Sequence, residues 1–490
     1  MELSLSHILF DRAAREPSRV AVLAPDGDIT YGQMASEAAA VSHLLAELGL
    51  AGARISILLP NIPRFGSILH GVLAASGTAV MTNPVNSPRE VQEQLSDAGV
   101  QAAFTTRALA RLLPEGTRSL LVDDLPEGIR EGGSGEERWL PLDPSRTAPV
   151  STRGGGAEAV VIFTAAETGR ARGAVLSHRN LVANLRSTVE MLRLGEEDRV
   201  IAALPNIHAF GLTVSLNAAM AAGAAVIPVE RFHPARTLEL IGAARATVLL
   251  GVPAMFMGFL SVAEKNAVPG HTLRVTLCGG ATLEAAVQAQ WEEVFGVPLR
   301  QGYGLTEAGP VCLFNDPARP NRPGTLGQPI PHVEVNIRDG AGQVLPDGEV
   351  GEICVRGENV FAGYLGESEE EPPYFHGPWL RTGDLGSRGA DGYFHFHGLL
   401  KAMFTRSGFN VYPREVERAV AGDARVARAR VTAQPDPAKE NEIILEVVPA
   451  AGASLSEDDV REICKACLAA YKQPGRIVVH PEARGGDPVT

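Results

Sequence analysis

AGARISILLPNIPRFGSILHGVLAASGTAVMTNP, residues 51–84, is the stretch that decides the fold. It holds a short apolar strand, ARISILLP, then a helix-like run from Ile62 to Ser76, then a second strand, TAVMTNP. A strand, a helix and a strand in this order predict a βαβ unit, because a helical crossover joins parallel strands. The stretch therefore predicts a parallel sheet with helices on its faces.

The same alternation recurs further along the chain. Helical runs are expected at 215–222, 237–244 and 284–295, between strand-like segments. Some 250 positions of this pattern indicate a parallel sheet covered on both faces. The strand-like segments are RVIAALP (199–205), AAVIPV (224–229), TVLLGVP (247–253), RVTLCGG (274–280) and VPLRQGYG (297–304).

The sequence pattern changes after Pro320. Short alternating strands with Gly and Asp turns predict a β-barrel-like subdomain at about 320–398. A compact α+β segment follows. We therefore expect an α/β protein with a large N-terminal domain of βαβ-layered sheets that includes the β subdomain (1–398), a hinge (399–402) and a small mobile α+β C-terminal domain (403–490).

Composition narrows the classes of function. The 490 residues include 44 Lys plus Arg and 57 Asp plus Glu, a net charge of −13. Bulk charge therefore argues against binding to nucleic acid or anionic lipid. The first residues lack the apolar core of a signal peptide, and no later apolar run approaches the length of a membrane span. We expect a soluble cytoplasmic protein without a membrane span.

The five cysteines are an odd number in a long chain, which does not indicate a disulfide framework. Cys464 and Cys467 form a C-x-x-C in a helical run, with no second pair and no nearby histidine. A redox or zinc role is the alternative reading, but we interpret the pair as one face of a helix.

The segment AVVIFTAAETGRARGAVLSHRNL (159–181) predicts a strand, a small polar loop, and a helix with Ser177 as its N-cap. Backbone N–H groups in such a loop can converge on a phosphate, but the segment taken alone is more typical of an ordinary surface loop. Further segments follow in order: LPNIHAFG (204–211), CGGATL (278–283), GYGLTEAG (302–309), RTGDLG (381–386), DGYFHFHGLLK (391–401) and RSGFNVYPREVE (406–417).

Together these segments resemble the adenylate-forming superfamily, which includes acyl-CoA synthetases, luciferases and non-ribosomal peptide adenylation domains. The resemblance runs nearly end to end. It implies that a carboxylic acid reacts with ATP to give an acyl-adenylate and pyrophosphate. The C-terminal domain then swings, and the CoA thiol displaces AMP.

The resemblance also implies roles for single residues of the adenylate site. Thr306 would contact the AMP phosphate, and Asp384 would accept hydrogen bonds from the ribose hydroxyls. Glu307 matches the family's magnesium ligand and is the one candidate for a metal ligand, but no metal is predicted there; a vestigial carboxylate and a residue that orients Thr306 remain alternatives. The residues expected to form the adenine shelf are Gly302, Tyr303 and Gly304, and those expected at the junction of acyl group and nucleotide are Gly279, Gly280 and Ala281.

Three positions match the apparatus of the second half-reaction. His208 matches a gate between acyl pocket and thiol tunnel, Lys401 the hinge residue, and Gly408 a glycine that lines the pantetheine tunnel. We list these three as the catalytic residues. Arg406 is a further candidate, as a partner for a CoA phosphate. The acyl pocket is expected from residues 206–215 and 251–259, which are apolar but do not identify the acid.

The phosphate loop departs from the family's pattern, which reads approximately T-S-G-T-T-G-x-P-K-G. A serine is lost at Ala165, a glycine at Ala166, and Glu167 places a negative charge near the β,γ-phosphates. At 4 Å and an effective dielectric of 20, that repulsion is roughly 4 kcal/mol. The degenerate loop comprises Thr164, Ala165, Ala166, Glu167, Thr168, Gly169 and Arg172, the last of which retains a cation.

The C-terminal domain departs in the same direction. Leu399 replaces an arginine that would touch ribose, and Val489 occupies the place of the terminal lysine that bridges carboxylate and phosphate. No lysine follows Lys472. Groups that serve ATP are therefore lost, while groups that hold an adenylate and form the thioester persist.

The pattern predicts an acid-thiol ligase that acts mainly in thioesterification, converting acyl-adenylate and CoA to acyl-CoA and AMP. A carboxylic acid or its adenylate and CoA are the expected substrates, magnesium is dispensable, and no tightly bound cofactor is expected. A separate adenylating enzyme would supply the acyl-AMP. A complete ATP-dependent acyl-CoA synthetase and a non-catalytic adenylate-binding regulatory module remain alternatives, and a carrier protein is an alternative thiol acceptor.

Overall fold

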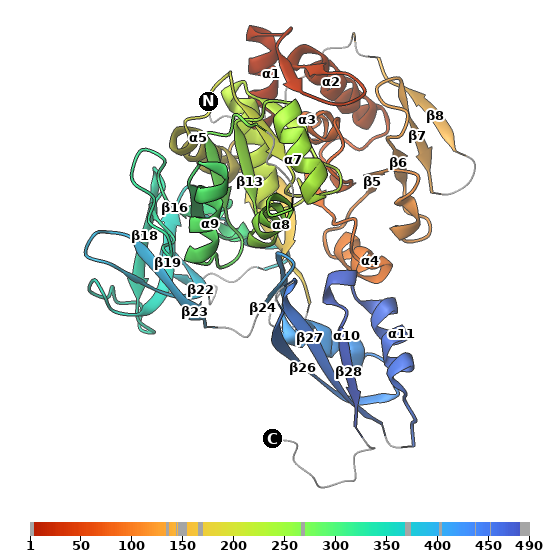
Figure 1. The fold of residues 1–490 in the computed structure, drawn as a ribbon. Coiled ribbons are helices and arrows are strands. Elements are labelled where there is room, and N and C mark those ends of the chain that lie inside the picture. The colour runs from red at the N-terminus through yellow and green to blue at the C-terminus, as the bar shows by residue number, and fades with distance from the viewer. Residues whose placement is uncertain are drawn as a thin grey trace.

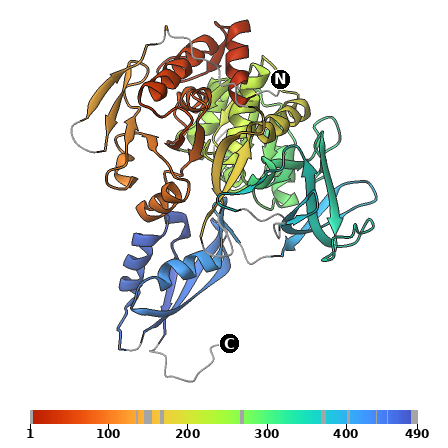
Figure 2. The ribbon, with the colours of Figure 1, turned by 180° about the vertical axis from the view of Figure 1, so that it is seen from behind.

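The computed structural model describes residues 4–133, 137–143, 145, 154–164, 170–265, 270–367, 374–400, 404–436, 438–450 and 452–480. Residues up to 400 form a large unit, and residues from 404 onward form a small one (Figure 1). The small unit lies next to α4 (Pro88–Asp97), as the view from behind also shows (Figure 2).

A nine-stranded sheet holds most of the predicted parallel strands. Its order is β17-β16-β15-β14-β13-β11-β12-β1-β2. The pairs from β1 to β15 are parallel, whereas β2, β16 and β17 pair antiparallel. The strands are β1 Val20–Val22, β2 Ile29–Thr30, β11 Arg199–Ala202, β12 Ala225–Pro228, β13 Val248–Gly251, β14 Val275–Cys278, β15 Leu299–Gly304, β16 Val311–Phe314 and β17 Gln328–Pro329.

A second nine-stranded sheet contains the βαβ unit of residues 51–84. Its order is β20-β10-β9-β4-β3-β5-β6-β7-β8, and β3 and β4 are parallel neighbours, as predicted. The strands are β3 Arg54–Leu58, β4 Thr78–Met81, β5 Ala102–Thr105, β6 Ser119–Leu121, β7 Gly128–Gly132, β8 Arg138–Pro141, β9 Glu158–Thr164, β10 Arg172–Ser177 and β20 Gly363–Tyr364.

Helices cover both sheets. The crossover helix α3 has the apolar sequence FGSILHGVLA, and every one of its residues is buried, as expected for a helix without a polar face. The helix expected at 215–222 begins earlier, because a π-helix (Gly211–Asn217) runs directly into α6. The helices of the large unit are α1 Leu5–Arg15, α2 Tyr31–Glu47, α3 Phe65–Ala74, α4, α5 His178–Leu192, α6 Ala218–Ala222, α7 Pro234–Ala243, α8 Pro253–Ala263 and α9 Ala285–Phe295.

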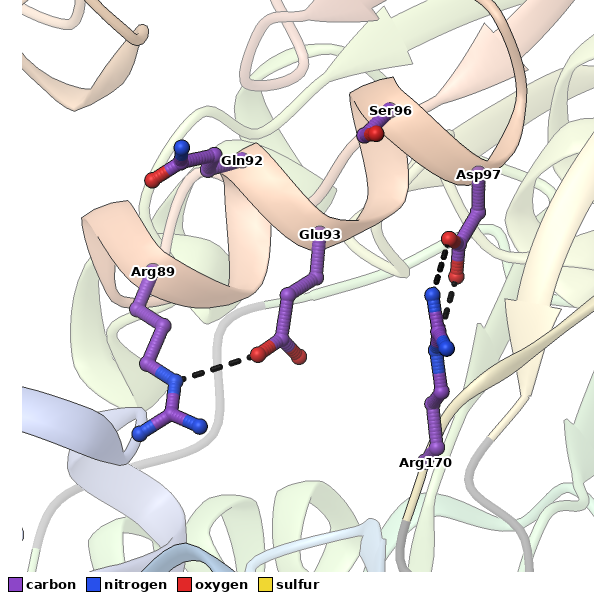
Figure 3. A pocket seen from close by; sticks show the side chains of 6 residues that line it. All are labelled: Arg89, Gln92, Glu93, Ser96, Asp97 and Arg170. Carbon is purple, nitrogen blue, oxygen red and sulfur yellow. Dashed lines mark hydrogen bonds and ion pairs between the residues drawn. The ribbon is translucent and has the colours of Figure 1, made fainter. Parts of the chain in front are cut away.

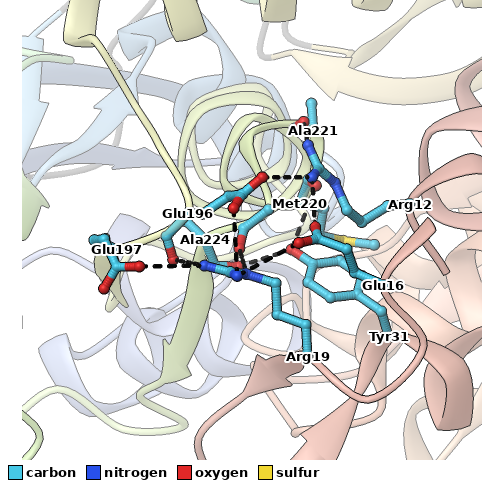
Figure 4. Close-up of polar contacts among 10 residues, drawn as sticks. Arg12, Glu16, Arg19, Tyr31, Glu196, Glu197, Met220, Ala221 and Ala224 are labelled. Atoms are coloured by element: carbon cyan, nitrogen blue, oxygen red, sulfur yellow. Dashed lines mark hydrogen bonds and ion pairs between the residues drawn. The ribbon is translucent and has the colours of Figure 1, made fainter.

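Arg12 on α1 and Arg19, which follows α1, bind the N-terminal segment to the rest of the large unit (Figure 4). Arg12 pairs with Glu16 and donates to the carbonyl of Ala221, while Arg19 donates to the carbonyl of Gly223. These carbonyls are at the C-terminal end of α6, where backbone acceptors are left free and cations bind well. Helix α1 is therefore part of the main core.

The strands expected after Pro320 form a five-stranded antiparallel sheet, with β23 pairing with β22 beside the path β18-β19-β22-β21. Buried and exposed side chains alternate along β18, which gives the sheet one apolar face toward the main core. The strands are β18 Val333–Arg338, β19 Gly351–Gly357, β21 Phe375–His376, β22 Trp379–Arg388 and β23 Phe394–Leu399.

The small unit has its own hydrophobic core. Cys464 and Cys467 are buried in this core on α11, which confirms that the C-x-x-C forms one helix face. Within the described residues, no group of three or more histidine, cysteine or acidic side chains is placed to hold a metal. The elements are β24 Phe404–Arg406, β25 Phe409–Val411, α10 Pro413–Ala421, β26 Val426–Asp436, β27 Glu440–Pro449, α11 Glu457–Cys467 and β28 Arg476–Val479.

Among the helices that the structure describes, none combines the length and the apolar character needed to cross a bilayer.

Candidate active site

The predicted residues of the acyl and nucleotide junction and of the adenine shelf lie at the carboxyl ends of the parallel strands β14 and β15, where ligands bind in parallel α/β sheets. Gly279 follows β14, and a Cβ atom there would lie 3.1 Å from Phe210 Cε1 and 3.5 Å from the Gly302 carbonyl oxygen. Gly280 has φ +81°, a conformation that favours glycine. Ala281 follows and is partly exposed. The backbone can therefore approach a ligand closely here.

Tyr303 and Asp384 join the two sequence motifs expected to bind the nucleoside. The Tyr303 hydroxyl, near the end of β15, donates a hydrogen bond to Asp384 Oδ2 on β22 at 2.5 Å. Burial and the adjacent Asp384 charge raise the pKa of Tyr303 well above its ordinary value, so the hydroxyl keeps its proton. Asp384 is partly exposed and stands opposite Leu399 on β23.

Glu307 lies in a short 3₁₀ helix, Thr306–Ala308, directly after the Gly302–Gly304 segment. The residue is 9% exposed, and its Oε1 accepts hydrogen bonds from Thr164 Oγ1 at 3.1 Å and from the Tyr364 hydroxyl at 2.7 Å. Glu307 thus ties β9 and β20 to the adenylate motif. A single carboxylate with two hydroxyl partners fits a structural role here, and a role as magnesium ligand stays the alternative.

The two ends of the phosphate loop are described, whereas Ala165, Ala166, Glu167, Thr168 and Gly169 lie outside the described residues. At its far end, the Arg172 guanidinium stacks on the Tyr364 ring, 3.6 Å from the ring centroid, and pairs with Glu367. The cation expected to replace the family's lysine is therefore already paired.

An open polar pocket of about 430 Å³ lies between α4 and Arg170, which directly follows Gly169 of the phosphate loop (Figure 3). Its arginines are both paired, Arg89 with Glu93 and Arg170 with Asp97. None of the predicted site residues lines it. Its charges satisfy one another, so the pocket offers no unbalanced charge to a ligand.

His208 lies in the loop after β11, and its Nε2 atom is buried without a hydrogen-bond partner in the described part of the chain. Burial lowers the pKa of His208 to about 4, so the imidazole is neutral at neutral pH. Its ring centroid lies 5.9 Å from that of Phe409, a residue of the small unit. A cavity of about 50 Å³ separates the units here and is lined by Asn83, His208, Tyr471 and Lys472 among others.

Gly408 brings the small unit against the same region. A Cβ on Gly408 would lie 2.9 Å from Val252 Cγ2, and a Cβ on Gly280 would lie 3.5 Å from Val252 Cγ1. One valine thus separates the predicted tunnel glycine from the predicted adenylate junction. The predicted hinge residue Lys401 and the terminal Val489 lie outside the described residues.

Arg406 does not face this interface. The side chain is 7% exposed and bonds Glu442 at 2.8 Å and the Tyr471 carbonyl at 3.0 Å, all within the small unit. The enclosed Arg406 guanidinium is therefore not available to bind a CoA phosphate. The arginine instead holds β24 to β27 and to the chain before β28.

The sequence reading missed Lys472, which is 5% exposed at the interface of the two units. Its Nζ lies 2.7 Å from Glu90 on α4 and 2.7 Å from Glu415 on α10. Burial opposes the charge of Lys472, but Tyr471 and the two carboxylates raise its pKa above the ordinary value. Glu90 and Lys472 are 382 positions apart, so no local pattern could have joined them.

Comparison with known proteins agrees with this arrangement. The sequence profile described as AMP-binding enzyme matches residues 9–365. The chain belongs to the AMP-binding enzyme family. The matched range includes the Gly279–Gly280 turn, the Gly302–Thr306 segment and Glu307.

Curated relatives of this family span almost the whole chain. A sulfoacetate–CoA ligase from Cupriavidus necator is 31% identical over 481 residues, 96% of this chain and 93% of that protein. A feruloyl-CoA synthase from Amycolatopsis sp is 30% identical over 468 residues, 95% of this chain and 93% of that protein. The chain is thus an enzyme of the acid-thiol ligase family, to which acyl-CoA ligases belong.

Solved structures share the fold of both units. A double mutant of o-succinylbenzoate CoA synthetase from Bacillus subtilis, bound with its product analogue OSB-NCoA, has a TM-score of 0.84 at 24% identity over 98% of this chain and 95% of that one. The same synthetase in complex with the acyl-adenylate intermediate OSB-AMP has a TM-score of 0.71 at 25% identity over the same shares. This confirms the predicted α/β fold with a small C-terminal unit.

Proposed function

We propose that this enzyme carries out mainly the second half-reaction of the acyl-CoA ligases, in which an acyl-adenylate and CoA give acyl-CoA and AMP. Adenylation by ATP is impaired or absent. The observation that carries this proposal is the position of Gly408 against Val252. Gly280 lies on the other side of the same valine. That contact brings the small unit to the region expected to hold the activated carbonyl.

The comparison of whole structures supports the same reading. The chain is more similar to the synthetase bound with a product analogue, at a TM-score of 0.84, than to that enzyme with its adenylate, at 0.71. Both scores cover 98% of this chain, so coverage does not account for the difference. The orientation of the small unit accordingly favours the thioester-forming state, with residues 399–402 proposed as the hinge.

Two described positions support the proposal that the enzyme reacts poorly with ATP. Arg172 is engaged by Glu367 and by the Tyr364 ring, so the cation expected in place of the family's lysine is not free for a triphosphate. Leu399, where the family's motif has an arginine by the resemblance described above, stands opposite Asp384 and offers no donor to ribose. Together with Glu167 and the missing terminal lysine, these positions disfavour ATP while leaving the AMP site usable.

The remaining chemistry needs orientation more than acid or base strength. Asp384 would hold the ribose hydroxyls, with Tyr303 fixing its carboxylate, and the Gly279–Gly280 backbone would lie along the mixed anhydride. The thiol sulfur attacks the acyl carbon, the bond from that carbon to the AMP oxygen breaks, and the thiol proton leaves. AMP is a good leaving group, so positioning supplies most of the rate.

Magnesium is dispensable in this proposal, because no triphosphate is bound, and no cofactor needs to remain bound between turnovers. The acyl-AMP comes from a separate adenylating enzyme. The neutral His208 imidazole adds no charge beside the uncharged thioester, consistent with a gating role. CoA is the thiol acceptor named for the relatives, and a carrier protein would present the same phosphopantetheine thiol.

A complete ATP-dependent synthetase is the second candidate, favoured by the relatives that span about 95% of the chain and are named CoA ligases or synthases. The two candidates differ in the first half-reaction alone. The deciding experiment supplies the purified protein either with ATP, magnesium, free acid and CoA, or with acyl-adenylate and CoA. Feruloyl, sulfoacetyl and long-chain acyl groups are suitable probes.

We expect thioester from the adenylate supply and no acid-dependent exchange of pyrophosphate into ATP. Robust exchange would establish the complete synthetase instead. Adenylate binding without thioester from either supply would indicate a binding module. A variant with Asp384→Ala serves as the control for adenylate bound at another place.

A further inference from the structure

Glu440, the first residue of β27, has a backbone conformation that is rare for its type. Its φ is +68°, in the left-handed region that glycine adopts freely and that costs other residues strain. Strain of this kind persists where the surrounding structure or the function requires the side chain. A glycine would fit this turn better, so the carboxylate needs another explanation.

The carboxylate of Glu440 points at the loop that meets the large unit. Its Oε2 accepts a hydrogen bond from the Gly408 backbone N–H at 3.2 Å. Its Oε1 is buried and has no hydrogen-bond partner among the residues that the structure describes. Buried carboxylate oxygens are almost always paired, because desolvation without a partner is costly. The free oxygen is therefore available to a donor that the enzyme binds.

Residues of both units locate the Glu440 carboxylate. Gly408 contacts Val252, and Val252 also contacts Gly280, so the carboxylate lies on the small-unit side of the adenylate junction. The negative charge of Glu440 also acts on Cys278, which belongs to the large unit. Burial raises the pKa of the Cys278 thiol well above its ordinary value, and Glu440 adds to that rise. Cys278 directly precedes Gly279.

The charged neighbours do not neutralise Glu440. Lys439 and Arg406 are the cations nearest in the chain and across the adjacent strand, and both bind Glu442 instead. The cross-strand partner of Glu440 is Asp436, whose Oδ1 accepts from the backbone of the turn. Among the described residues, the titratable and charged groups near Glu440 include Cys278 on β14, Arg406 on β24, Asp436 on β26, and Lys439 and Glu442 next to it in the chain.

We infer that Glu440 is a catalytic residue that accepts the proton of the incoming thiol as sulfur attacks the acyl-adenylate. This inference rests on the proposed thioester-forming function. A thiol with a pKa of about 8.5 is only about 3% ionised at pH 7, so a proton acceptor is useful when the thiol enters.

The step balances without any further reactant. The sulfur forms a bond to the acyl carbon, its proton passes to Glu440 Oε1, and the bond between the acyl carbon and the AMP oxygen breaks. AMP departs with the electron pair, and the protonated Glu440 releases its proton to solvent when the small unit withdraws. Because the acceptor travels with the small unit, it meets the thiol in the thioester-forming orientation, which the contact of Gly408 with Val252 defines.

The test uses the full chain with synthetic acyl-adenylate and CoA. Glu440→Gln keeps the size of the side chain and removes the proton acceptor, and we expect the rate of thioester formation to fall about 100-fold. Binding of a non-hydrolysable adenylate mimic should change less than about 2-fold, because Glu440 is on the small unit. Glu446→Gln, on the same strand and away from Gly408, is the matched control.

Two further measurements separate catalysis from structure. Seleno-CoA carries a selenol that is already ionised at neutral pH, so it should restore most of the rate of Glu440→Gln. Glu440→Gly should lose the same rate with CoA but should have a melting temperature no lower than the wild type, since the strained conformation is relieved. A structural role would instead lower the melting temperature and would not respond to the selenol.

The outcomes distinguish this inference from the proposed function. If the wild type forms thioester and Glu440→Gln is equally fast with CoA, the role of Glu440 is wrong and the function stands. Failure of seleno-CoA to rescue a slow Glu440→Gln also overturns the role. If the wild type forms thioester only when ATP and acid are supplied, the function is corrected and Glu440 is tested in that assay by the same variants. If the wild type forms none from either supply, both are overturned.

Discussion

Gly408 of the small unit and Val252 of the large unit are in direct contact, and a Cβ on the glycine would come within 2.9 Å of Val252 Cγ2. Gly408 also has φ +82°, so both its space and its backbone exclude a side chain. The two units can approach this closely because one of them presents bare backbone at the contact.

The first prediction follows from this contact. Gly408→Ala should slow thioester formation from acyl-adenylate by about 10-fold or more, because strain of about 1–3 kcal/mol adds to the clash. Binding of an adenylate mimic should be unchanged, as measured by calorimetry. Gly452→Ala is the control, since Gly452 has φ +77° in the same unit but open space around it. Equal rates for Gly408→Ala and Gly452→Ala would show that the contact does not matter for turnover.

The second prediction concerns the buried ion pair between Lys472 and Glu90. Glu90→Gln should weaken docking of the small unit, because Lys472 then keeps Glu415 alone as a carboxylate partner. We expect a broader distance distribution between spin labels at Ser96→Cys on α4 and Lys465→Cys on α11, both exposed positions. Glu93→Gln, on the exposed face of α4, is the control. An unchanged distribution in Glu90→Gln would mean that other contacts hold the units together.

The third prediction separates the two members of the Tyr303–Asp384 pair. Asp384→Asn should weaken adenylate binding by about 10- to 150-fold, the range for losing a hydrogen bond to a charged group at about 1.5–3 kcal/mol. Tyr303→Phe should weaken it less, because the carboxylate remains. Calorimetry with the adenylate mimic measures both. A larger loss for Tyr303→Phe would place the ribose elsewhere.

The fourth prediction is a loss of stability in acid through His70 on α3. Burial lowers the pKa of His70 to about 4, against an ordinary value of 6.5, and its Nδ1 is buried without a partner in the described chain. Between these values the unfolded chain binds a proton that the folded chain does not, so stability falls as the pH falls. The full contribution is about 3 kcal/mol. Denaturant titrations from pH 7 to 4.5 measure it, and His70→Gln should flatten that dependence. An unchanged slope in this variant would assign the effect to other groups.

The fifth prediction treats the proposed defect in adenylation as repairable. Leu399→Arg, Val489→Lys and the loop changes Ala165→Ser, Ala166→Gly and Glu167→Thr should each restore little pyrophosphate release alone and disproportionately more together, because such groups act as a unit. Pro488→Lys is the companion variant for the register of the terminus. A folded combined variant that forms thioester but releases no pyrophosphate would place the defect outside these positions.

Local pattern was enough to predict the scaffold. The apolar run of α3 between β3 and β4 predicted a parallel pair, and the glycines at 279 and 280 predicted a close backbone approach, because both depend on neighbours in the sequence. The pairing of Arg172 with Glu367 and the enclosure of Arg406 were not predictable. A side chain's partner depends on tertiary packing, and no local spacing encodes it.

The same limit applied at the interface of the units. Lys472 reads in the sequence as an ordinary exposed lysine, and its burial becomes clear when α4 and α10 converge on it. The π-helix before α6 was also missed, since its apolar residues have the same spacing as those of a regular helix. Sequence thus predicted the strands that carry the candidate residues better than it predicted the contacts that those residues make.

The burial of the five cysteines bears on whether an activated acyl group reacts with the enzyme's own thiols. An acyl-adenylate acylates any thiolate within reach, and Cys278 directly precedes the turn where that intermediate is expected. Because burial and Glu440 raise the pKa of Cys278, it remains a thiol and is a poor nucleophile. We therefore expect little acylation of the enzyme's own chain by the proposed acyl-adenylate, and a mass spectrum of the protein after turnover should show no acylated cysteine.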